Sequence, residues 1–286
     1  MTSALRLAVL AVFVAASFPC SAAAADTDAN PNANADTGID AAEPDVSVIA
    51  LPTTLSLPSG GFMFRVTHRF TRPLGDGSFG DLAQDFFGFD SSASVGMELR
   101  FGVRRGLQAG IYRTSDRTID LFAQQTLMRQ GPRPFGAAVQ ASVEGLDNFQ
   151  ESHSPRVVLI LSRKLGERGA FYVEPGWVGN ANLSPPQSGS EDSSFVLGLG
   201  GRLNFGENYS LLAEFQPVIA GYRGIATSGG ESDPHVAFAF ERHVGGHVFQ
   251  INFSNHTGTT PANVARAQDN RVAGWYIGFN LSRKFY

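Results

Sequence analysis

Apolar and polar side chains alternate along residues 272–286, the last stretch of the chain. The apolar positions are Trp275, Ile277, Phe279, Leu281 and Phe285. A period of two places one set of side chains on each face of a β-strand. We expect this final strand to pair with the first one and close a β-barrel.

The same alternation recurs from about residue 61 onward and predicts about 12 strands, an even number, as in bacterial membrane barrels. The predicted strands are residues 61–70, 94–102, 107–112, 118–129, 135–145, 156–164, 170–178, 194–205, 208–217, 235–242, 247–254 and 272–286. The fold class is therefore all-β, a closed antiparallel up-and-down transmembrane β-barrel. The pattern is weakest in 156–164, because residues 157–161 are apolar on both faces.

The connections between these strands also alternate, here in length. Short, Gly-containing turns fall at 103–106, 131–134, 165–169, 206–207 and 243–246. Long polar loops fall at 71–93, 146–155, 179–193, 218–234 and 255–271, and only 113–117 breaks the rule. Short turns on one rim and long loops on the other are typical of an outer-membrane barrel. A soluble secreted β-protein, the alternative, has no reason to sort its loops in this way.

The composition agrees with a barrel that is apolar outside and polar inside. The mean hydropathy is −0.06, which is the average expected when the two faces of each strand differ. A net charge of −4 gives no reason to expect nucleic acid as a partner. Beyond the first 25 residues, no apolar run approaches the roughly 18 residues that a membrane-spanning helix needs.

The N-terminal part divides into two predicted segments. Residues 1–25 resemble a signal peptide, with Arg6 before an apolar run and small residues at 22–25. The single cysteine, Cys20, lies inside it, so lipidation of Cys20 is an alternative to its removal. Residues 26–58 are predicted to be a disordered periplasmic linker, and residues 59–286 form the barrel domain.

Several short motifs carry a resemblance to a known family. They are T-H-R-F at 67–70, D-S-S-A-S-V-G-M-E-L-R-F-G-V at 90–103, A-G-I-Y-R at 109–113 and N-L-S-R-K-F at 280–285. With these motifs the chain resembles a bacterial β-barrel family known as a domain of unknown function. The resemblance implies an outer-membrane-type barrel and brings no substrate and no catalytic residues.

If the apolar side chains face lipid, the charged ones line the lumen. The predicted lumen-lining residues are Arg65, Arg69, Glu98, Arg100, Asp120, Glu144, Glu174, Arg202, Glu214, Glu241 and Lys284. Two interpretations stay open. The charges form an internal network of ion pairs and hydrogen bonds that fills the lumen, or they line a narrow polar pore.

Two further patterns are candidates for a catalytic site or a metal site. Ser254 and His256 lie on one face of an extended chain, as in barrel lipid hydrolases, but position 252 is Asn where those enzymes have His. His243 and His247 flank a Gly-Gly turn and would form a metal site only if they faced each other. The glycines at 198, 200 and 201 lie in a strand with no helix after it, so we expect them to relieve crowding inside the barrel or to allow bending rather than to form a phosphate loop. We therefore predict no enzyme, no catalytic residues, no metal and no cofactor.

The predicted function is an outer-membrane barrel of a Gram-negative bacterium that acts as a narrow pore or small-molecule uptake channel. A filled structural barrel that anchors a periplasmic protein partner is the first alternative, and a barrel lipid hydrolase is the second. The expected partners are membrane lipid and small solutes.

Overall fold

The computed structural model describes residues 42–182, 192–223, 225–226, 230–231, 233–266 and 274–285. The predicted signal peptide and residues 26–41 of the predicted linker lie outside these ranges. No helix in the described part of the chain is long and apolar enough to cross a membrane.

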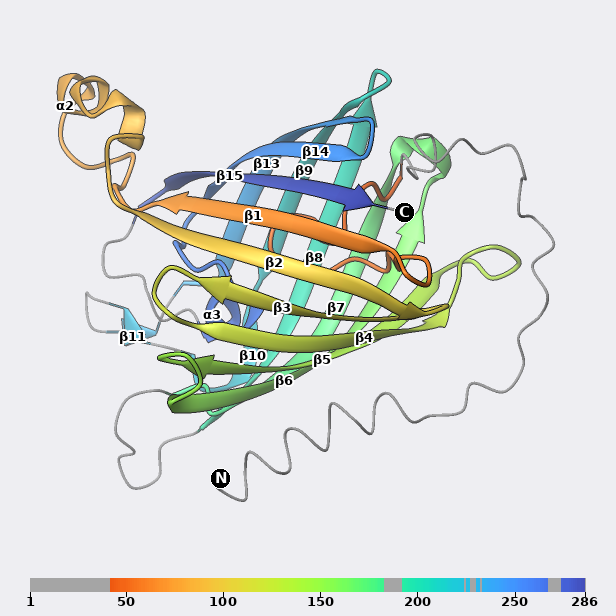
Figure 1. Ribbon diagram of the computed structural model, residues 1–286. Helices are drawn as coiled ribbons and strands as arrows, with labels where there is room; N and C mark the ends of the chain where they lie inside the picture. Colours follow the sequence, from red (N-terminus) through yellow and green to blue (C-terminus); the bar gives the residue numbers. More distant parts are fainter. Residues whose placement is uncertain are drawn as a thin grey trace.

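Twelve antiparallel strands close into a barrel (Figure 1). They are β1 (Phe62–Phe70), β2 (Ala93–Arg104), β3 (Leu107–Thr114), β4 (Ile119–Met128), β5 (Gly136–Leu146), β6 (Glu151–Lys164), β7 (Gly169–Gly179), β8 (Ser193–Phe205), β9 (Tyr209–Gln216), β13 (His235–Val244), β14 (His247–Ser254) and β15 (Tyr276–Phe285). Each strand pairs with the next, and β15 pairs with β1 from Phe62↔Phe285 to Arg69↔Gly278. The predicted fold class is confirmed, including closure by the last strand.

Short strands and helices lie in the connections between the barrel strands. The strand β10 (Val218–Gly221) continues the pairing with β8, and β11 (Ile225–Ala226) pairs only with β12 (Gly230–Glu231). The short helices are α2 (Phe79–Gln84), η1 (Phe86–Gly88), η2 (Gly166–Arg168) and α3 (Pro261–Arg266).

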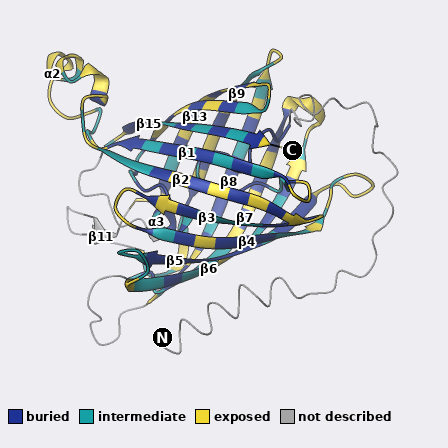
Figure 2. Cartoon of the chain, viewed as in Figure 1, coloured by how far each residue is buried: buried dark blue, intermediate teal, exposed yellow. Residues whose placement is uncertain are grey.

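The two faces of the wall differ as the alternation predicts. Large apolar side chains such as Phe171, Leu203 and Phe249 are more than half exposed on the outer surface. Figure 2 shows exposed and buried residues alternating along the strands. The apolar belt lets a closed sheet, whose backbone groups are all paired, sit in hydrocarbon.

The barrel has a short-turn rim and a long-loop rim. The short-turn rim carries the β2–β3, β4–β5, β6–β7, β8–β9 and β13–β14 connections, and the long-loop rim carries the others. One predicted long loop is wrong: β5 and β6 pair up to Leu146↔Glu151, so only residues 147–150 connect them. The polar start of β6 hid this extension, because it carries no apolar alternation.

Residues 42–58, the larger part of the predicted linker, do not match the prediction. They follow a defined course inside the barrel, whereas a disordered linker outside it was predicted. Val46, Val48, Ile49, Leu51 and Leu57 are all buried inside the barrel. We call residues 42–58 the luminal hairpin, because the bridge Ser47↔Pro52 folds the segment back on itself. Composition alone predicted disorder here, since nothing local in the segment shows that a barrel wall will surround it.

Candidate functional site: the filled lumen

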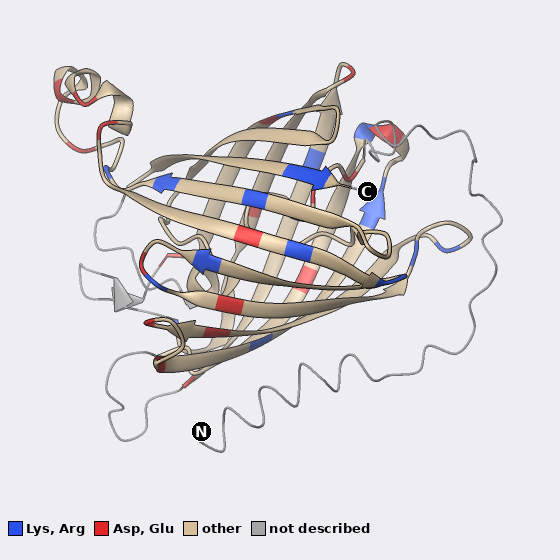
Figure 3. Cartoon of the chain, viewed as in Figure 1, with Lys and Arg blue, Asp and Glu red and all other residues tan. Residues whose placement is uncertain are grey.

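All eleven side chains predicted to line the lumen are buried, none more than 4% exposed. They project from nine of the twelve strands, and Figure 3 shows residues of both signs on neighbouring strands. Ion pairs join several of them. Glu98 lies 2.7 Å from Arg100 and 3.9 Å from Arg65, and Arg202 makes two hydrogen bonds to Glu241.

The tip of the luminal hairpin is a tight turn in mid-barrel. The Val48 amide donates to the Leu51 carbonyl at 2.8 Å, and the Thr53 amide donates to the Val46 carbonyl at 2.8 Å. Both legs then run toward the short-turn rim. Glu43 reaches Lys164 at the end of β6, and Pro58 lies against Gly102 near the end of β2. The hairpin therefore enters and leaves by the same rim.

Glu214 on β9 binds the tip of the hairpin. Its carboxylate accepts the amides of three consecutive residues, from Ile49 at 2.6 Å, from Ala50 at 2.9 Å and from Leu51 at 2.8 Å. Successive backbone N–H groups that converge in this way form a concavity suited to an anion. The buried carboxylate and the buried amides thus satisfy each other.

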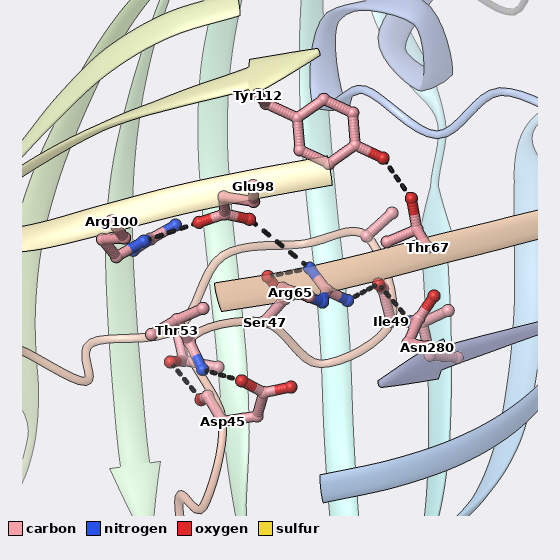
Figure 4. A network of polar contacts seen from close by, with 12 residues as sticks. Asp45, Ser47, Ile49, Thr53, Arg65, Thr67, Glu98, Arg100, Tyr112 and Asn280 are labelled. Atoms are coloured by element: carbon pink, nitrogen blue, oxygen red, sulfur yellow. Dashed lines mark hydrogen bonds and ion pairs between the residues drawn. The ribbon is translucent and has the colours of Figure 1, made fainter. Parts of the chain in front are cut away.

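Arg65 on β1 binds the same tip, and Figure 4 shows its contacts with Ser47 and Ile49. Its guanidinium donates to the Ile49 carbonyl at 2.6 Å and to the Ser47 hydroxyl at 2.7 Å. Glu98 supplies the countercharge beside it. Such a charge-assisted hydrogen bond is stronger than one between neutral groups.

Amide side chains of the wall extend this pattern along the hairpin. Gln250 donates to the Val48 carbonyl at 2.7 Å, and Asn280 donates to the Ile49 carbonyl at 3.2 Å. Gln124 donates to the Thr53 carbonyl at 3.0 Å. Gln108 both donates to the Leu55 carbonyl and accepts the Leu57 amide. The predicted lumen-lining set lacks these side chains because it contains only charged residues.

The base of the hairpin is held by charged groups near the short-turn rim. Glu43 accepts a hydrogen bond from the Tyr172 hydroxyl and lies 3.1 Å from the Lys164 ammonium. Lys284 donates to the Pro44 carbonyl. The predicted lumen-lining residue Lys284 therefore contacts protein backbone.

Part of the lumen wall is apolar. Val48 and Ile49 lie in one buried cluster with Val158 and Ile160 of β6 and Leu212 of β9. This explains why residues 157–161 are apolar on both faces: one face meets the membrane side and the other meets the hairpin. A strand apolar on both faces was the sequence signal that protein fills this lumen.

Glycines on β8 make room for the hairpin. A Cβ atom at Gly198 would lie 2.8 Å from the Leu51 Cδ2 atom, and one at Gly200 would lie 3.3 Å from the Val48 Cγ2 atom. Their side-chain positions face the lumen, so the interpretation that they relieve crowding there agrees with these distances. The crowding comes from the hairpin.

Arg156 is a buried basic residue of the lumen that the sequence analysis missed, and it donates to Gln140 at 2.8 Å. Residues 151–155 precede it in β6 and were predicted to be loop. With the strand extended to residue 151, Ser154, Arg156 and Ser162 fall on one buried face.

The β14–β15 connection fills the lumen from the long-loop rim. Ala262 and Ala265 of α3 lie in a buried cluster with Val178 and Val196, and the Thr260 hydroxyl donates to Glu144. We call residues 255–265 the inward loop.

His256 of the inward loop is 2% exposed and stacks edge-on against His235, with ring centroids 5.5 Å apart. Burial, and then the charge of nearby His235, lower the pKa of His256 to about 4. The neutral ring is therefore the form that the inward loop accommodates.

Little space remains between the two segments. The cavity lined by Ser47, Arg65, Tyr112 and Thr259 has a volume of about 20 Å³, enough for about one water. A larger cavity of about 310 Å³ lies at the short-turn rim, beside Glu43, Ser56 and Lys164.

The candidate catalytic pair and the candidate metal-binding pair make other contacts in the structure. The Ser254 hydroxyl donates to the backbone carbonyl of His256, not to its ring. His243 pairs with Val248 and His247 pairs with Val244, so the two rings point to opposite faces of the hairpin and do not face each other. Among the described residues no cluster of three or more His, Cys, Asp or Glu could hold a metal ion.

Comparison with known proteins places this geometry among membrane barrels. The family model described as "Membrane bound beta barrel domain (DUF5777)" matches residues 45–285, a span that includes most of the luminal hairpin. No curated protein matches the chain.

The solved structures similar to the chain include a porin and a phospholipase. A NanC porin is 10% identical, with a TM-score of 0.50 over 79% of this chain and 99% of the porin. Outer membrane phospholipase A from Escherichia coli is also 10% identical, with a TM-score of 0.42 over 79% of this chain and 92% of that one. At these identities the likeness concerns the fold alone.

Proposed function

The chain belongs to the DUF5777 family of membrane-bound β-barrel domains, and on that premise we propose that it is an outer-membrane channel for small solutes whose lumen the luminal hairpin closes. The hairpin is the resting plug, and passage requires it to withdraw. The fold shared with a porin supports a channel, and the occupied lumen supports a closed one.

The orientation follows from the rims. Outer-membrane barrels keep their short turns in the periplasm and their long loops outside. The luminal hairpin then enters from the periplasm, and Glu43 lies beside Lys164 at the periplasmic rim.

The course of the hairpin is the observation that carries the proposal. Both legs leave by the short-turn rim, so the hairpin can withdraw without any part of the chain being threaded through the barrel. Its tip is held by hydrogen bonds to Glu214, Arg65 and Gln250 and by the apolar cluster of Val48 and Ile49 with the wall. Water can replace each hydrogen bond, at a net cost of about 1 kcal/mol for the neutral Gln250 and roughly 2 kcal/mol for a bond to a charged group.

The test measures ion conductance of the full chain in a planar bilayer while urea is raised to about 4 M, a range that releases weakly held elements first. We expect few current steps without urea and discrete, reversible steps once the hairpin leaves. Retained heat-modifiable mobility on a gel shows that the barrel itself stays folded.

A disulfide lock provides the matched control. Leu51→Cys with Gly198→Cys joins the tip to β8, where the side chain of Leu51 already lies within 2.8 Å of a Cβ built at position 198. The oxidised pair should give no steps in urea, and reduction should restore them. Each single cysteine variant should behave like the reduced pair.

A filled barrel that anchors a periplasmic partner is the second candidate. The small cavity of about 20 Å³ and the apolar luminal cluster favour it. Absence of current in the reduced pair and in the wild-type chain, at every urea concentration where the barrel stays folded, would reject the channel and leave this candidate.

A further inference from the structure

Most polar contacts between the barrel wall and the luminal hairpin are hydrogen bonds from wall side chains to the hairpin backbone. Wall side chains donate to the carbonyls of Pro44, Val48, Ile49, Thr53 and Leu55. They accept the amides of Ile49, Ala50, Leu51 and Leu57. Backbone amides are common to every peptide, so these contacts do not depend on the sequence of the segment that occupies the lumen.

The donors and acceptors come from wall strands far apart in the sequence. They lie on β1, β3, β4, β9, β14 and β15, and residues as distant as Glu214 and Ile49 are joined. Each of these groups is buried. When the hairpin leaves, these polar groups line the lumen and are placed to pair with the N–H and C=O groups of a peptide backbone.

The apolar cluster complements these polar groups. Val158, Ile160 and Leu212 contact the apolar side chains at the hairpin tip, and Gly198 leaves space for a branched side chain. An inorganic ion cannot use such a surface, because apolar groups do not replace its hydration. Sugar hydroxyls can donate to the Glu214 carboxylate, but a sugar has no apolar side chains to cover Val158, Ile160 and Leu212.

We propose that the emptied lumen is a binding site for short peptides with apolar side chains, and that such peptides are solutes that exchange with the luminal hairpin. This inference rests on the proposed channel and names its substrate class. Glu214 takes three successive amides of the peptide, Arg65 and Gln250 take its carbonyls, and the Val158–Ile160 surface takes its side chains.

Exchange requires a free peptide to compete with a tethered one. A segment joined by a short link is present at an effective concentration in the millimolar range. A free peptide at about 10 mM therefore competes on similar terms.

The experiment follows withdrawal of the hairpin in the full chain. Ala50→Cys, in a Cys20→Ser background, places a thiol at the tip, and its rate of labelling by a membrane-impermeant maleimide is measured in lipid vesicles. The probes are trialanine and the capped peptide Val-Ser-Val-Ile-Ala-Leu-Pro, which repeats residues 46–52. We expect at least a fivefold faster labelling with the capped peptide, a smaller increase with trialanine, and no change with sucrose.

A matched peptide isolates backbone recognition. The same capped peptide with the Ile, Ala and Leu amides N-methylated keeps its side chains but cannot donate to Glu214. It should lose the acceleration. Ser56→Cys, on the outgoing leg, is the second reporter and should respond in parallel with Ala50→Cys.

Two results would overturn the inference. One is equal acceleration by the methylated and unmethylated peptides, and the other is no acceleration at either reporter. If urea still produces current steps that the disulfide lock abolishes, only the peptide specificity fails and the channel proposal stands.

Discussion

The luminal hairpin enters the barrel from the short-turn rim, whereas the inward loop enters from the long-loop rim, and the two are held in different ways. Polar wall side chains bind the hairpin through its backbone, with Glu214 at the centre. The inward loop is held by the apolar contact of Ala262 and Ala265 with Val178 and Val196, by the hydrogen bond from Thr260 to Glu144 and, at its start, by hydrogen bonds between Asn255 and β13.

This difference in contacts indicates which of the two segments can leave the lumen. A hydrogen bond to a polar wall can be exchanged for one to water or to another amide at small net cost. Apolar burial has no such substitute in water, because the exposed surface must be hydrated. The hairpin also buries Val48 and Ile49 in the apolar luminal cluster, but the side chains of an entering peptide can take their place. We therefore expect the hairpin to be the exchangeable plug and the inward loop to stay in place.

The largest effect should come from Glu214→Ala. It leaves three buried amides without an acceptor, which costs about 3 kcal/mol or more. Thiol labelling at Ala50→Cys should rise at least tenfold, while labelling at Thr259→Cys on the inward loop should not change. Glu174→Ala is the matched control, since both carboxylate oxygens of Glu174 are buried without a hydrogen-bond partner among the described residues. Equal release by both variants would contradict a specific role for Glu214.

A charge buried beneath the inward loop should release the inward loop and leave the luminal hairpin in place, the reverse of the effect of Glu214→Ala. Ala265→Asp buries a carboxylate beside Val178 and Val196, which offer it no hydrogen bond. We expect this burial to destabilise the packed inward loop by about 3 kcal/mol. Labelling at Thr259→Cys should rise and labelling at Ala50→Cys should stay low. Asn263→Asp adds the same charge at a half-buried position of α3 and should have little effect.

Acid should loosen the inward loop through His256. Its pKa is lowered to about 4 in the folded protein, below the usual value of about 6.5. The unfolded state then binds the proton more readily, so stability is full above about pH 6.5 and falls as the pH drops toward 4, by about 3 kcal/mol.

The measurement is the rate of labelling at Thr259→Cys between pH 7 and pH 4, corrected for thiol ionisation with a free peptide. The groups around His256 are His235, the backbone of Asp233 and, through His235, Glu214. His256→Gln should flatten the profile. A profile unchanged by that substitution would assign the acid response to another of these groups.

The smallest effect is expected from Gly198→Ala. The added methyl group lies 2.8 Å from the Leu51 Cδ2 atom, and such overpacking costs about 1–2 kcal/mol. Labelling at Ala50→Cys should rise a few-fold, and Leu51→Ala should restore the low rate. On the opposite face of β8, Gly201→Ala meets Phe171 at an ordinary 3.4 Å and should change nothing. A failure of Leu51→Ala to rescue would place the crowding elsewhere.

The sequence alone determined the wall of this protein. A period of two, turn residues and loop lengths are local properties, so they predicted twelve strands, closure by the strand at residues 272–286 and the inward position of residues such as Arg65 and Glu214. The largest boundary differences are the start of β6, five residues earlier than predicted because its polar start carries no alternation, and the start of β15, four residues later than predicted.

Only the tertiary structure decided what occupies the lumen. The contacts of residues 42–58 join groups up to 240 positions apart, as between Pro44 and Lys284, and they use backbone atoms that every residue possesses. No local pattern encodes such contacts, because the partners meet only after twelve strands have closed around them. The traces of the hairpin in the wall sequence were the apolar inner face of Val158 and Ile160 and the glycines at 198 and 200, and their meaning depended on knowing that the wall surrounds something.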